Sequence, residues 1–65
     1  MQITINHQTH QLPAGATLAD AIELQQARPP FAAAVNLQFV PRAAYAQHLL
    51  QDGDHIEIIA PITGG

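Results

Sequence analysis

The chain has 65 residues, a formal net charge of −3 and no cysteine. This length allows one small domain with a compact core, because so short a chain buries only about 60% of its unfolded surface. The lack of cysteine excludes disulfides, thiolate metal sites and sulfur carried on a side chain. Only Arg28 and Arg42 are basic, against five acidic residues, which argues against a nucleic-acid-binding protein that must contact many phosphates.

The first six residues, MQITIN, alternate apolar and polar side chains and predict a strand with one buried face. A turn at residues 6–9 and a short second strand through Leu12 would complete a hairpin over residues 1–12. This alternation is unlike the apolar run of a signal peptide or a membrane span. We therefore expect a cytoplasmic protein that does not contact a membrane.

A helical period follows in residues 13–27, where Leu18, Ala21 and Ile22 fall on one face. Thr17 is a candidate N-cap, with Asp20 three positions later. The sequence RPP at residues 28–30 should end the helix before Pro29, because the residue that precedes a proline avoids helical backbone angles.

The second half of the chain returns to strands. FAAAVN and FV predict two short strands joined by a turn at residues 36–38, and Pro41 ends the second of them. Residues 42–50 have the spacing of one or two helical turns. The sequence QDGD at residues 51–54 predicts a turn, which is the simplest explanation of its two aspartates, Asp52 and Asp54.

The last strand, HIEIIA at residues 55–60, combines a buried and an exposed face. Its alternation places Ile56, Ile58 and Ala60 toward the core and His55, Glu57 and Ile59 on the other side. An isoleucine on the outer face departs from the pattern. We therefore expect Ile59 to contact a partner protein.

This order of hairpin, helix, strand pair, helical turn and last strand predicts an α+β fold of the β-grasp type. One main helix would pack across a mixed sheet of four to five strands. We expect the folded domain to comprise residues 1–60 and a flexible tail to comprise residues 61–65.

Four short motifs add a family pattern: AVN at residues 34–36, VPR at 40–42, DGD at 52–54 and GG at the end of the chain. In this order and spacing, the chain resembles the ThiS group of ubiquitin-like sulfur carriers over essentially its whole length. Two departures are Tyr45, where family members often have tryptophan, and Pro61, which stiffens the base of the tail.

The resemblance implies a carrier without catalytic residues, bound cofactor or metal. The carboxylate of Gly65 would be adenylated by a ThiF-like enzyme using ATP and converted to a thiocarboxylate with sulfur from a donor system. Thiazole synthase, a ThiG-like enzyme, would then use this sulfur to form the thiazole ring of thiamine. The narrow tail residues Ile62, Thr63 and Gly64 would enter a channel in the partner, since five extended residues span roughly 17 Å.

Three functions remain open from the sequence. The first is the thiazole-pathway carrier, and the second is the small subunit of molybdopterin synthase, or another ubiquitin-like sulfur carrier, which shares the chemistry but not the acceptor. The third is a β-grasp binding module whose C-terminus does no chemistry.

His7 and His10 bracket the first turn, and we interpret them as solvated turn residues because no thiol or carboxylate lies near them in the sequence.

Overall fold

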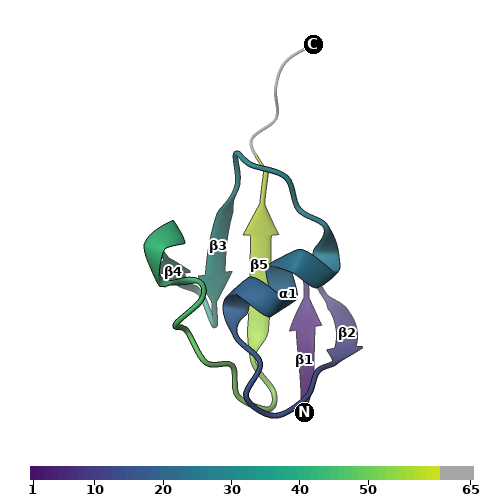
Figure 1. Ribbon diagram of the computed structural model, residues 1–65. Helices are drawn as coiled ribbons and strands as arrows, with labels where there is room; N and C mark the ends of the chain where they lie inside the picture. Colours follow the sequence, from purple (N-terminus) through teal and green to yellow (C-terminus); the bar gives the residue numbers. More distant parts are fainter. Residues whose placement is uncertain (61–65) are drawn as a thin grey trace.

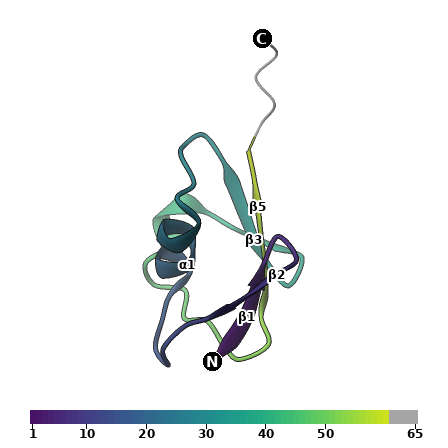
Figure 2. The ribbon, with the colours of Figure 1, turned by 90° about the vertical axis from the view of Figure 1, so that its right-hand side faces the viewer.

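The computed structural model describes residues 1–60, which form a five-stranded mixed sheet with one α-helix packed on one face (Figures 1 and 2). The elements in chain order are β1 (Gln2–Ile5), β2 (Gln8–Gln11), α1 (Leu18–Gln25), β3 (Ala32–Val35), β4 (Gln38–Val40), the 3-10 helix η1 (Arg42–Ala44) and β5 (His55–Ile59). This is the expected α+β arrangement. The expected tail, with Ile62, Thr63, Gly64 and Gly65, lies outside the described residues. Within residues 1–60, no helix is long and apolar enough to span a membrane.

The strand order in the sheet is β2-β1-β5-β3-β4, so the last strand of the chain lies in the middle. β5 runs parallel to β1 and antiparallel to β3, as the central arrow in Figure 1 shows. Hairpins flank it on both sides, because β1 pairs with β2 and β3 pairs with β4 in antiparallel register.

Both hairpins close through two-residue turns that begin with asparagine. Asn6 and His7 form the first turn and Asn36 and Leu37 the second, and all four residues have positive φ values between 49° and 70°. The turns are therefore shorter than the expected ranges 6–9 and 36–38. Paired left-handed residues match the twist of the flanking strands, and asparagine tolerates this conformation better than most residues.

The two asparagine side chains also bind β5 from opposite sides. Asn6 accepts a hydrogen bond from the Ile58 backbone N–H at 2.9 Å and donates to the Ile58 carbonyl at 3.3 Å. Asn36 accepts from the His55 backbone N–H at 3.0 Å and donates to the Asp54 carboxylate, also at 3.0 Å. Each turn thus connects its hairpin to the central strand.

The helix begins and ends through local backbone contacts. Thr17 is the N-cap, as expected: its hydroxyl accepts from the Asp20 N–H, and the Asp20 carboxylate accepts from the Thr17 N–H at 2.8 Å. At the other end Gln26 adopts a left-handed conformation, so the helix stops before the prolines. The expected inward face is confirmed, since Leu18, Ala21 and Ile22 are buried.

The core lies between α1 and the sheet. Its buried residues are Ile3, Ile5, Leu18, Ala21, Ile22, Ala33, Val35, Val40, Leu50 and Ile56. In β5 the expected alternation holds for Ile56, which is 1% exposed, and for Ile58, which is partly buried against the core. It is wrong for Ala60, which is exposed because β5 and its pairing with β3 end at Ile59.

The turn before β5 confirms the structural interpretation of its aspartates. Asp52 accepts from the Gln2 backbone N–H at 2.7 Å, and Asp54 accepts from the Gln51 backbone N–H at 2.8 Å. Gly53 lies between them with a φ of 89°, which favours glycine. The segment after Pro41 forms only the single turn of η1.

The turn at Asn36 and Leu37 allows a two-sided test of this account. Asn36→Ala removes two hydrogen bonds and places alanine in a left-handed conformation, and should lower the free energy of unfolding by about 1–3 kcal/mol. Leu37→Gly relieves the same backbone strain at an exposed position and should raise that free energy by about 0.5–1 kcal/mol. Urea denaturation measures both changes. Equal stabilities for the two variants would contradict the assigned turn geometry.

Candidate functional site

One face of the sheet has no helix packed on it within residues 1–60, because α1 covers the opposite face (Figure 2). The strand register places the side chains that alternate with the core on this open face. From β1 and β5 these are Thr4, His55, Glu57 and Ile59. From β3 and β4 they are Ala32, Ala34 and Phe39. The open face therefore combines polar and apolar regions.

The apolar region is a strip formed by Ala32, Ala34, Phe39 and Ile59. Ala34 pairs with Phe39 on one side of β3, and Ala32 pairs with Ile59 on the other. The small side chains of the two alanines lie between two larger ones that project into solvent: Phe39 is 69% exposed and Ile59 is 57% exposed. The expected exposure of Ile59 is confirmed, and the residue is part of a larger apolar surface.

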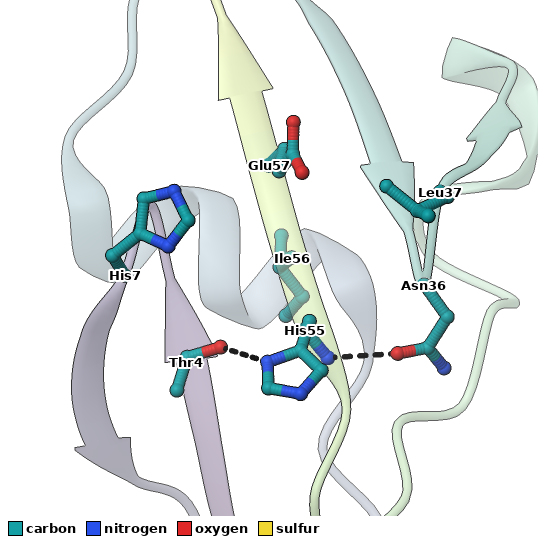
Figure 3. Close-up of a pocket in the computed structure, with 7 residues that line it drawn as sticks. All are labelled: Thr4, His7, Asn36, Leu37, His55, Ile56 and Glu57. Carbon is teal, nitrogen blue, oxygen red and sulfur yellow. Dashed lines mark hydrogen bonds between the residues drawn. The ribbon is translucent and has the colours of Figure 1, made fainter.

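A hollow of about 440 Å³ lies next to the strip (Figure 3). Its lining residues are Thr4, His7, Asn36, Leu37, His55, Ile56 and Glu57. His7 approaches from the first hairpin and Leu37 from the second, with β5 between them. The Thr4 hydroxyl lies 2.7 Å from His55 Nδ1, and this hydrogen bond orients the imidazole.

Two residues at the rim of the hollow have unfavourable backbone conformations. His7 and Leu37 have φ values of 70° and 69°, and Leu37 is 87% exposed. A left-handed conformation costs a non-glycine residue roughly 1–2 kcal/mol, and a large exposed side chain regains little of this by burial. The exposed side chain of Leu37 extends the apolar surface toward the hollow. Residues in strained left-handed conformations are frequent at functional sites.

The sequence alone found Ile59 but not Phe39 or Leu37. Phe39 precedes the buried Val40 in an apolar pair, and only the pairing with β3 shows which of the two faces the core. His10 also differs from expectation, because it lies in β2 and is partly buried. Its Nε2 has no hydrogen-bond partner among residues 1–60. His7 is a turn residue, as expected.

The geometry of this face fits protein binding, because exposed apolar side chains from neighbouring strands form one strip. No group of three or more histidine, aspartate or glutamate side chains within residues 1–60 could hold a metal ion. The strip ends at Ile59, the last residue of β5, so it lies where the chain continues toward Gly65. Fold and surface together define a small β-grasp protein with an exposed apolar strip at the end of its central strand.

Comparison with known proteins identifies the family. The family model for ThiS matches residues 2–65. The sulfur carrier protein ThiS of Escherichia coli (strain K12) is 46% identical over 66 aligned residues, and the alignment covers all of both chains. A thiazole synthase of Paramagnetospirillum magneticum is 36% identical over all of this chain, which spans 20% of that protein. The chain belongs to the ThiS family, as its motifs predicted.

Solved structures confirm the fold. The crystal structure of the thiamine biosynthesis protein ThiS from Geobacter metallireducens covers all of both chains with a TM-score of 0.81. The solution structure of a thiamine biosynthesis protein from the same organism gives a TM-score of 0.79 and covers 88% of that chain. Both are 17% identical to this chain, so the shared β-grasp fold is what they establish.

Proposed function

We propose that this chain is a sulfur carrier of thiamine biosynthesis and that the carboxylate of Gly65 carries the sulfur. The full-length similarity to the Escherichia coli sulfur carrier is the main support. The Gly-Gly sequence at residues 64–65 adds to it, because two positions without side chains suit a narrow channel.

The chemistry follows from the properties of a terminal carboxylate. It is ionised at neutral pH and is therefore a nucleophile but a poor electrophile. One of its oxygens attacks the α-phosphorus of ATP, pyrophosphate leaves, and an acyl adenylate forms at Gly65. A hydrosulfide ion (HS⁻) from the donor system then attacks the carbonyl carbon and displaces AMP. The new C–S bond replaces the C–O bond to AMP, and loss of the S–H proton leaves a thiocarboxylate.

The catalytic groups of both steps belong to the partners. A ThiF-like adenylating enzyme would bind ATP, so the carrier itself needs no cofactor. Ile62, Thr63 and Gly64 would lie in the channel of this enzyme while the apolar strip, including Ile59, contacts its surface. The ATP requirement favours the cytoplasm as the location.

Thiazole synthase is the proposed sulfur acceptor. A thiazole synthase of Paramagnetospirillum magneticum contains a segment similar to this whole chain within a longer polypeptide. A covalent link between two such units is consistent with a need for them to meet during the reaction. This observation favours a thiazole acceptor over a molybdopterin one, and the carrier would visit the adenylating enzyme and the synthase in turn.

The channel hypothesis predicts the effect of Gly64→Val. A β-branched side chain widens the tail and restricts its backbone, so ATP–pyrophosphate exchange by the adenylating enzyme should fall by roughly 100-fold. Gly64→Ala should give a smaller loss, and the melting temperature of both variants should match that of the unchanged protein. Near-normal exchange with Gly64→Val would show that no narrow channel encloses this residue.

The docking hypothesis predicts the effect of Ile59→Asp. Burial of an isoleucine side chain contributes about 1.5–3 kcal/mol, so the dissociation constant with the adenylating enzyme should rise roughly 10-fold to 100-fold. Isothermal titration calorimetry measures this change.

Leu24→Asp is the matched control. Leu24 is 48% exposed on α1, so this variant adds the same charge on the opposite face and should leave binding within twofold. Equal affinities for the two variants would exclude the apolar strip from the interface. Unfolding of Ile59→Asp would mean that the register of β5 is wrong by one residue.

A further inference from the structure

A second groove lies on the helix side of the sheet. Its volume is about 420 Å³, and its lining residues are Ala27, Pro29, Pro30, Phe31, Arg42 and Tyr45. Phe31 directly precedes β3, where Ala33 and Val35 point to the core, so the alternation places Phe31 on the helix side too. The groove and the apolar strip are therefore on opposite faces of the sheet.

The walls of the groove are held in place by packing. The rings of Phe31 and Tyr45 stack, with centroids 5.9 Å apart and planes inclined by 10°. Both side chains, together with Ala27, pack against the hydrophobic core. The adjacent Pro29 and Pro30 have restricted backbones. A ligand that enters this groove would order few side chains, which lowers the free-energy cost of binding.

The charge of the groove is opposite to that of the whole chain. Arg42 lines it and Arg28 immediately precedes Pro29, and these are the only two basic residues among the 65. Among residues 1–60, no acidic side chain lines the groove. The acidic residues lie elsewhere: Asp20 and Glu23 on α1, Asp52 and Asp54 before β5, and Glu57 on the open face. The chain as a whole has a net charge of −3 and would repel an acidic partner. In this groove, however, a partner's carboxylate could bind Arg42 without competition from an acidic side chain in the lining.

We propose that the groove is a docking site for an acidic segment of a protein partner, in which a carboxylate lies next to an apolar side chain. The carboxylate would accept two parallel hydrogen bonds from the planar guanidinium of Arg42. The neighbouring apolar side chain would contact Phe31, Tyr45 and the prolines. A peptide fits better than a nucleic acid, because a single lining cation cannot follow a row of phosphates whereas apolar walls accept a side chain.

This site is separate from the apolar strip but close to the same end of the sheet. Phe31 is followed by Ala32, which pairs with Ile59 at the end of β5. A partner held in the groove would therefore lie near the point where the chain leaves the sheet, and the open face would stay free. Two proteins could bind the domain together, one on each face.

A peptide titration tests the proposal without any sulfur chemistry, so its result is independent of the proposed function. The probe is a synthetic hexapeptide with one leucine and one phenylalanine flanked by four acidic residues, added to the 15N-labelled full chain. Amide shifts should change at Ala27, Arg28, Phe31 and residues 42–45, because Pro29 and Pro30 have no amide proton. The matched control peptide carries asparagine and glutamine in place of the acids and should bind at least fivefold more weakly.

Variants of the protein locate the contact. Arg42→Gln should weaken binding of the acidic peptide about threefold to fivefold, the range of an exposed ion pair, and Arg42→Lys should lose less. Phe39→Ser, on the opposite face, should leave it unchanged. Shifts centred on the open face, equal affinity for the two peptides, no binding at millimolar peptide, or full affinity in Arg42→Gln would each overturn the proposal.

Discussion

The arrangement of this protein depends on how its last strand is held in the centre of the sheet. β5 is far in sequence from β1, so their parallel pairing must overcome the entropy of closing a long loop. Asn6 and Asn36 stabilise the closed arrangement. Each begins the left-handed turn of its own hairpin and also accepts a hydrogen bond from the β5 backbone. The same two residues therefore connect local turn chemistry with the long-range topology.

This constraint positions the exposed apolar surfaces. With its register fixed on both sides, β5 turns Ile56 into the core and Ile59 onto the open face, and a shift by one residue would exchange them. β3 brings Ala32 and Ala34 between Ile59 and Phe39, which creates the apolar strip. The helix side carries the aromatic groove with Arg42. A chain of 65 residues thus offers two chemically different surfaces beside one end of its central strand.

The sequence predicted the features that depend on local period and capping. Thr17 with Asp20 defined the helix start, and the alternation in β5 identified Ile59 as exposed. It did not predict Phe39, because the neighbouring Val40 is also apolar and only pairing across the sheet distinguishes them. The left-handed Leu37 was missed for a related reason: its conformation is imposed by strand twist and not by its own propensity. Long-range pairing, more than composition, decides these positions.

The proposed attachment of sulfur at Gly65 can be tested directly. The direct test incubates the full chain with ATP, a ThiF-like adenylating enzyme and a sulfur donor system, and then measures intact mass and fragments by mass spectrometry. We expect a mass gain equal to the replacement of one oxygen by sulfur, located on Gly65 and dependent on ATP. An adduct on any other residue, or no adduct with a cognate enzyme that releases pyrophosphate, would contradict it.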